Sequence, residues 1–207
     1  MLIGEGQDWL EGVQRAWEIL SLINPESICH KAKVDFDELA GHYILTLFNE
    51  KVYISSKERR VWGGSKVADF ILNELSHYSR LSILWYLIQA RDIPLSGNLT
   101  SPREVDGGLI FAQGSHVLPV DRLIEKYGND VESLVKKGIS LGGEYMNYGD
   151  ASIRLFPFPK VPVVLLIWKS DEEFPARVDV LFDSTCSEHL PTDIIWSTAM
   201  MSILVML

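Results

Sequence analysis

The stretch from Pro162 to Asp193 constrains the fold more than any other part of this sequence. Val163–Trp168 is an unbroken apolar run, and a strand of that composition must be covered on both of its faces. The segment 169–176 is charged and contains a proline, so it predicts the connection of a hairpin. Residues 177–183 then alternate between polar and apolar side chains, as a strand does when one face is buried. The sequence therefore predicts a β-hairpin at the centre of the molecule.

The other patterns do not alternate between strand and helix in the way that a parallel sheet requires. We expect an α+β fold with a mostly antiparallel sheet built from two hairpins, packed by one long helix and a C-terminal helix. Residues 1–40 are predicted to form an N-terminal helix and extension, and residues 41–207 a single α+β domain. The predicted elements are a helix at 7–23, a hairpin at 42–55 with its turn at 49–51, a helix at 66–91 that is either continuous or broken near 77–79, a strand at 109–111, helices at 120–127 and 130–137, a strand at 151–156 and a buried helix at 194–207.

Composition excludes several classes of protein. The chain has 207 residues, of which 47% are hydrophobic and 23% charged, as in an ordinary globular domain. Its net charge of −9 argues against a nucleic-acid partner, because binding phosphates requires clustered Lys and Arg. Two cysteines cannot form a disulfide framework, and no leader peptide is recognised, so a cytoplasmic location is expected. The apolar segment 194–207 is shorter than the roughly 20 residues that span a bilayer, so no membrane contact is predicted.

Several spaced motifs resemble those of a known family. They are Leu81–Leu87, Ile93–Gly97, Arg103, Gly107-Gly108, Pro159, Pro162, Trp168, Asp171–Ala176 and Val180–Asp183. Together they resemble an uncharacterised prokaryotic domain of unknown function, found mainly in anaerobic bacteria and archaea, over roughly residues 40–207. Some relatives join this domain to an iron–sulfur module like that of corrinoid methyl-transfer proteins. The resemblance therefore implies an accessory role near one-carbon or tetrapyrrole metabolism, with an iron–sulfur protein as partner, because this chain lacks the cysteines that a cluster needs.

Cys186 and His189 form half of a possible metal site. The natural complement is Cys29-His30, but the side chains of adjacent residues point apart and rarely bind one ion together. A structural zinc site needs four converging ligands. We therefore predict no metal, and expect Cys186 to be packed at the entry of a helix.

Asp183 ends the second strand of the central hairpin and is the leading candidate for a functional carboxylate. It is a possible general base, an acceptor that anchors a ligand, or the partner of Arg103, Arg154 or Arg177. The alternative is structural, since an Asp before Ser-Thr is a common cap that accepts backbone N–H bonds. The capping interpretation is favoured.

Two further histidines are candidates for ligand binding. His77 lies on the predicted long helix, and imidazole is the usual axial ligand of a metal-containing tetrapyrrole. His116 lies on a predicted loop, where functional residues concentrate. The glycine pairs of the chain match no phosphate-binding motif, and the Asp-x-His-x-x-Gly motif of corrinoid-binding domains is absent.

Three hypotheses about function follow. The first is a non-catalytic binding or accessory domain that holds a small ligand, including a tetrapyrrole, or a partner protein. The second is a small hydrolase- or transferase-like enzyme that uses Asp183 with an arginine and either His116 or His189. The third is a protein-interaction module whose acidic N-terminal helix binds a basic partner, because residues 1–50 hold nine acidic and three basic side chains.

Overall fold

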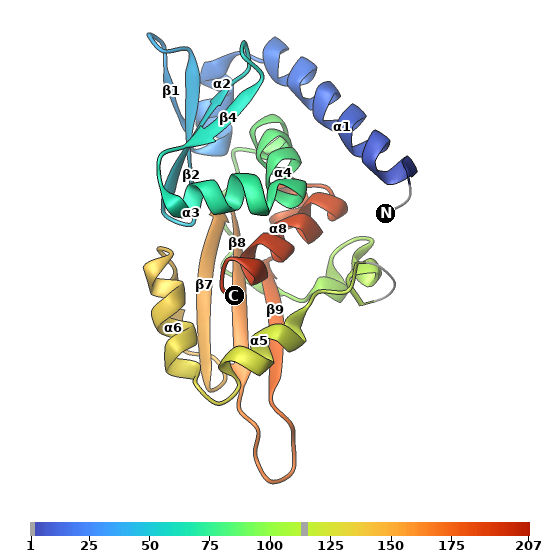
Figure 1. Cartoon of the computed structure of the whole chain (residues 1–207), viewed down its shortest axis with the longest axis vertical. Coiled ribbons are helices and arrows are strands. Elements are labelled where there is room, and N and C mark those ends of the chain that lie inside the picture. The colour runs from blue at the N-terminus through green and yellow to red at the C-terminus, as the bar shows by residue number, and fades with distance from the viewer. Residues whose placement is uncertain (1–2, 113–115) are drawn as a thin grey trace.

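The computed structural model of the protein describes residues 3–112 and 116–207, and it confirms the α+β class (Figure 1). Two antiparallel sheets lie at opposite ends of the molecule, with helices packed between and beside them. The two hairpins expected from the sequence fall in different sheets. A backbone hydrogen bond of 2.9 Å from Phe48 N to the carbonyl of Phe156 joins the two sheets directly.

The first sheet has four strands in the order β1-β2-β3-β4. They are β1 (Asp35–Asp37), β2 (His42–Leu47), β3 (Glu50–Ser55) and β4 (Arg60–Gly63). The hairpin between β2 and β3 turns at Phe48 and Asn49, one residue before the predicted position. Their φ values of 47° and 66° fit a two-residue turn with both central residues left-handed, whose twist matches that of the strands.

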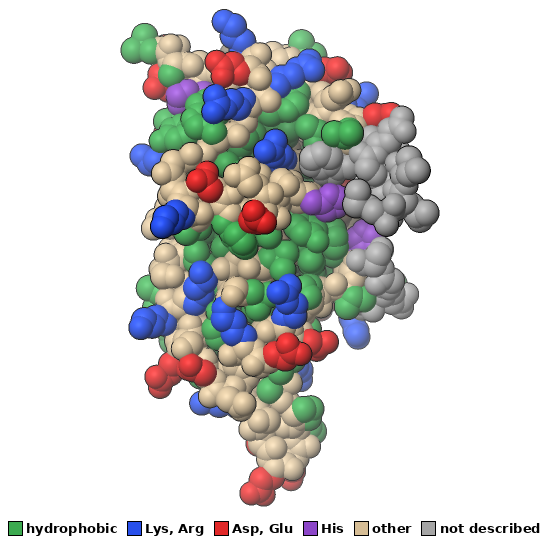
Figure 2. All heavy atoms as spheres, viewed as in Figure 1, with side chains coloured by type: hydrophobic (Ala, Val, Ile, Leu, Met, Phe, Trp, Pro, Cys, Tyr) green, Lys and Arg blue, Asp and Glu red, His purple; other side chains and the backbone are tan. Residues whose placement is uncertain are grey.

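The second sheet has five strands in the order β5-β9-β8-β7-β6, with the predicted central hairpin in its middle. They are β5 (Leu99–Thr100), β6 (Glu144–Met146), β7 (Ala151–Phe158), β8 (Val161–Trp168) and β9 (Arg177–Asp183). Every residue of β8 from Val161 to Ile167 is buried, so this strand is covered on both faces. The connection from β8 to β9 protrudes from the body, and Figure 2 shows acidic side chains at its tip.

Eight α-helices and three other helical turns are described. They are α1 (Ile3–Leu22), α2 (Pro25–Ala32), α3 (Lys66–Asp69), α4 (Ser76–Gln89), α5 (Val120–Tyr127), α6 (Val131–Ser140), α7 (Cys186–His189) and α8 (Thr192–Leu204), with a π-helical turn η1 (Phe70–Glu74) and the 3₁₀ turns η2 (Pro102–Glu104) and η3 (Gly108–Ala112). Helix α4 packs against α1 and α8, and α6 packs against β7. No helix in the described ranges is long and apolar enough to cross a membrane.

The helix predicted over residues 66–91 is not continuous, and its break lies earlier than residues 77–79. The π-helical turn Phe70–Glu74 separates α3 from α4, and Leu75 then departs from helical geometry with φ −99° and ψ 19°. A π turn inserts one extra residue into the helical repeat, so the apolar side chains before and after it face different neighbours. Side-chain periodicity cannot detect this, because apolar residues occur on both sides of the break.

Four other parts of the chain also differ from the prediction. The strand expected at 109–111 is the 3₁₀ turn η3, since Gly107 adopts φ 73° and turns the chain there. The predicted N-terminal extension contains α2, capped by Asn24, and the short strand β1. Strand β6 was not predicted, and helix α6 runs to Ser140 instead of ending at residue 137.

Gly138 lets α6 approach β7 closely. A Cβ atom at this position would lie 2.3 Å from Cγ1 of Ile153, which is fully buried. We predict that Gly138→Ala lowers the free energy of unfolding by about 1–3 kcal/mol, the usual range for overpacking a core, although alanine is the better helix former.

The matched control is Gly12→Ala on α1, where a Cβ atom would meet only Leu81 at 3.9 Å. This variant should be neutral or stabilised by up to about 1 kcal/mol. Urea unfolding of both variants is the measurement, and equal stabilisation of the two would contradict the close approach of α6 to β7.

Candidate functional site

Asp183 is buried at the end of β9, and both of its carboxylate oxygens accept hydrogen bonds. Oδ1 accepts from the backbone N–H and hydroxyl of Ser96, at 3.1 and 3.0 Å, and from the backbone N–H and hydroxyl of Thr185, at 3.1 and 2.7 Å. Oδ2 accepts from the backbone N–H of Gly97 at 2.8 Å. The carboxylate therefore ties the segment before β5 to the segment after β9.

This environment suits a permanently charged structural acceptor. Burial alone would raise the pKa of Asp183, but the hydrogen bonds from Thr185, Ser96 and Gly97 outweigh it and hold the pKa below its usual range. A general base needs a pKa near the working pH and a lone pair directed at the substrate. Asp183 has neither property while these donors are bound.

His189 and Cys186 lie on the short helix α7, and both side chains are buried. Nδ1 of His189 accepts a hydrogen bond from the backbone N–H of Arg91 at 3.2 Å, and Nε2 has no hydrogen-bond partner in the described part of the chain. Burial, reinforced by the charge of Lys160, lowers the pKa of His189 to about 4. Burial also raises the pKa of the Cys186 thiol, so this thiol is neutral at pH 7.

The remaining candidates are dispersed over the molecule. Arg154 on β7 forms an ion pair with Glu144 on β6. His77 on α4 contacts the ring of Tyr78 edge to face, with ring centroids 5.4 Å apart, and His116 contacts Trp196 in the same way at 4.6 Å. Cys29 lies on α2, and within residues 3–112 and 116–207 no three His, Cys, Asp or Glu side chains converge on a metal site.

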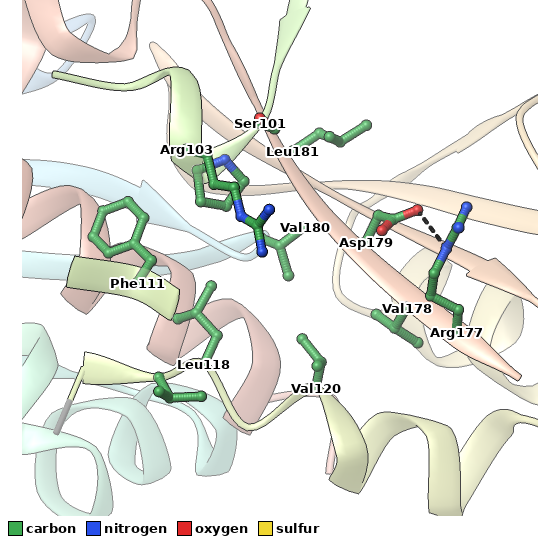
Figure 3. Close-up of a pocket in the computed structure, with 12 residues that line it drawn as sticks. Ser101, Arg103, Phe111, Leu118, Val120, Arg177, Val178, Asp179, Val180 and Leu181 are labelled. Atoms are coloured by element: carbon green, nitrogen blue, oxygen red, sulfur yellow. Dashed lines mark ion pairs between the residues drawn. The ribbon is translucent and has the colours of Figure 1, made fainter. Parts of the chain in front are cut away.

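A cavity of about 700 Å³ lies beside β9 (Figure 3). Arg103 and Arg177 both line this cavity. Its lining comes from the chain before α5, from the first residue of α5 and from five consecutive residues of β9: Ser101, Pro102, Arg103, Phe111, Val117, Leu118, Val120, Arg177, Val178, Asp179, Val180 and Leu181. Successive side chains of a strand point to opposite faces of the sheet. A cavity lined by five residues in a row must therefore lie along the edge of the strand, and we call it the β9 groove.

The edge of β9 is open because β5 is short. The two strands pair only at Leu99↔Asp183 and Thr100↔Phe182, after which the chain leaves the sheet at Ser101. Continued pairing would place Pro102 opposite Val180, where a proline has no N–H to donate. Ser101 and Glu104 form a capping box that starts the 3₁₀ turn η2 at this point.

The groove combines an apolar wall with two guanidinium groups. Phe111, Leu118 and Val120 form the wall. Arg177 pairs with Asp179, with Nε 3.2 Å from Oδ2. Arg103 forms no hydrogen bond or ion pair with any residue that the structure describes, and Figure 3 shows its guanidinium directed into the groove. One uncompensated positive charge therefore lies beside an apolar surface.

Sequence reasoning singled out both arginines but missed the rest of the groove. Asp179 and Val180 belong to the recognised strand pattern, yet nothing local shows that their edge is unpaired. Phe111 ends a predicted strand and Val120 begins a predicted helix, but neither local pattern shows that these side chains lie beside β9. Only the pairing register of β5 on β9 brings these two parts of the chain together.

The fold and the groove define an α+β domain with an open-edged antiparallel sheet. The chain belongs to the family described as "Domain of unknown function (DUF3786)", whose model matches residues 24–204. The match begins earlier than the resemblance near residue 40 suggested, and it includes α2 and β1. No curated protein and no solved structure matches the chain.

Replacing the Asp183 carboxylate by an amide should destabilise the fold. In Asp183→Asn one of the two acceptor atoms becomes a donor and faces an N–H group of the 96–97 segment or of Thr185. We expect a loss of about 2–4 kcal/mol, since hydrogen bonds to a charged group are lost and a buried donor is left unpaired. Chemical denaturation measures this loss. Glu172→Gln, at an exposed position of the β8–β9 connection, is the control, and equal stability of the two variants would refute the structural role.

His189 should make the protein sensitive to mild acid. Its pKa is about 4 in the folded state and near 6.5 in the unfolded chain, so below pH 6.5 only the unfolded state takes up the proton. Stability is therefore fully present above pH 6.5 and falls as the pH drops toward 4, by up to about 3 kcal/mol. Denaturation of wild type and His189→Gln at several pH values isolates this contribution, because all carboxylates are common to both. If the stability of both proteins changes equally over pH 4–7, His189 does not cause the loss of stability in acid.

Proposed function

We propose that this protein is a non-catalytic binding domain whose site is the β9 groove. The guest has an apolar body and a carboxylate. The observation that carries this proposal is the guanidinium of Arg103, which has no partner in the described part of the chain and points into an apolar cavity.

The composition of the groove supports binding in preference to catalysis. Ligand sites are mostly apolar with a few polar groups that fix orientation, and their volumes are commonly about 300–1,000 Å³. Arginine presents a planar set of donors that matches a carboxylate, and this pair is stronger beside an apolar wall than in bulk water. Asp179 already neutralises Arg177, which leaves Arg103 as the cation available to the guest.

A tetrapyrrole with carboxylate side chains has this combination of chemistry. It joins a large apolar ring to groups that arginine binds. A role near one-carbon metabolism, together with an iron–sulfur protein as partner, would suit such a ligand and follows the resemblance of the sequence. The acidic N-terminal helix as a docking element stays a separate prediction.

Binding should depend on Arg103. The probe is 1-anilinonaphthalene-8-sulfonate, an aromatic anion whose fluorescence rises in apolar sites, with displacement by decanoate, haem or cobalamin. Arg103→Gln should weaken the binding of the probe and of decanoate about tenfold or more, as expected when a charged hydrogen bond is lost.

The matched control is Arg122→Gln. Arg122 is exposed on α5 and lies outside the groove, so its removal changes the net charge by the same amount. Equal weakening by both variants would show a general charge effect and reject the site. Displacement of the probe by haem but not by decanoate would favour the tetrapyrrole as guest.

A further inference from the structure

We infer that the carboxylate-bearing guest of the β9 groove is the C-terminal segment of another protein, which binds as an extended strand along β9. The inference rests on the proposed function, because it uses the same groove and the same arginine. It adds the backbone of β9 as the second recognition element.

The backbone of β9 offers unused hydrogen-bonding groups along the groove. Ser184 N donates to the carbonyl of Asn98 at 2.9 Å, so Ser184 faces β5 and not β8. Backbone direction alternates along a strand, so Phe182, Val180 and Val178 face the same way as Ser184. Phe182 pairs with Thr100, but in the part of the chain that the structure describes no strand lies beside Val180 and Val178 on this side.

Pairing on the other side of the strand agrees with this assignment. Ile167, the β8 residue opposite Val178, uses its carbonyl to accept a hydrogen bond from Asp150 N on the β7 side, at 3.1 Å. The backbone N–H and C=O groups of Ile167 and Val178 therefore point away from each other. By this alternation the N–H and C=O of Val178 and Val180 point away from β8, and no backbone hydrogen bond of the turns and loops in the described residues uses them.

An extended peptide satisfies these groups better than a compact ligand does. Each residue of a strand presents one N–H and one C=O at a spacing that matches a neighbouring strand, and peptides commonly bind by extending a sheet in this way. A fatty acid or a flat ring meets the apolar wall and Arg103 but leaves the donors and acceptors of Val178 and Val180 to water. The groove therefore matches a peptide backbone in more of its features.

The geometry also selects a chain end. Thr100 occupies the edge of β9 next to Phe182, so a bound strand that runs along this edge must stop or turn away before Ser101. Arg103 belongs to η2, which begins directly after Ser101, so the free cation lies at the blocked end of the edge. A terminus next to a guanidinium is a carboxylate and not an ammonium group. The peptide would therefore run parallel to β9 with its C-terminus at Arg103.

The two faces of β9 predict a sequence pattern in the peptide. One face of the groove carries Phe111, Leu118 and Val120, and the other carries Arg177 and Asp179. Because strand residues alternate between faces, apolar side chains at alternate positions of the peptide would contact the wall. Polar side chains would occupy the positions between them.

The experiment uses the full chain and a synthetic library of hexapeptides that end in Val, Leu, Ile or Phe with a free carboxylate. The same library with amidated C-termini is the paired probe. We expect binders in the free-acid library, with affinity reduced about tenfold or more by amidation and by Arg103→Gln, but unaffected by Arg122→Gln.

Two further readouts distinguish strand addition from other binding modes. N-methylation along the best peptide should abolish binding at alternate positions only, since every second N–H faces β9. Hydrogen exchange measured by NMR should slow at the amides of Val178 and Val180 when the peptide binds. Decanoate should not slow exchange at these two amides, and the amide of Asp179 should be protected with or without the peptide because it faces β8.

The outcomes separate this inference from the proposed function. Binding of decanoate or haem that depends on Arg103, without any peptide binder, overturns the inference and leaves the proposed function standing. If none of these probes binds, both the inference and the proposed function are overturned. Peptide binding that is indifferent to amidation overturns the selection of a chain end. A concentration-dependent dimer in sedimentation, with Val178 and Val180 protected in the absence of peptide, would show that a second copy of this chain occupies the edge and overturns the inference.

Discussion

The hydrogen bonds that Asp183 accepts from Ser96 and Gly97 are the interaction on which the groove depends. They fix where the chain joins β9, and so they set the register in which Thr100 faces Phe182. In that register Pro102 would lie opposite Val180, where β5 would need a backbone N–H to continue. Proline has none, and β5 ends before it. The open edge of β9 is therefore a consequence of a carboxylate and a proline that lie outside it.

The connection from α4 to β5 is held at both ends by the segment 183–189. At its beginning, Arg91 donates its backbone N–H to His189, and its carbonyl accepts from Nζ of the buried Lys160 at 2.7 Å. At its end, Asp183 binds the 96–97 backbone. A loop without regular structure gains a fixed path when buried polar groups accept and donate its backbone hydrogen bonds. Two titratable residues, Asp183 and His189, thus act on the architecture of the groove from a distance.

Some of this arrangement was readable from the sequence. The β8–β9 hairpin follows from composition and alternation, and the capping box at Ser101 follows from a local motif. The break at Phe70–Glu74 was not readable, because a π turn preserves apolar periodicity on both sides of it. The groove was not readable either, since it depends on which residue of β9 faces Pro102, and only long-range pairing determines that. The boundary predicted at residue 40 stays a prediction.

An open sheet edge is normally a hazard, because it invites pairing with other sheets. Here the edge is limited in ways that admit a single chain end better than another sheet. Thr100 blocks one end, and Phe111, Leu118 and Val120 form the apolar wall of the groove. Arg177 and Asp179 place charges on the solvent face, where a flat apolar sheet would have to bury them. The same features that protect the edge from aggregation leave it open to a narrow, extended and negatively terminated guest, which is the chemistry that Arg103 favours.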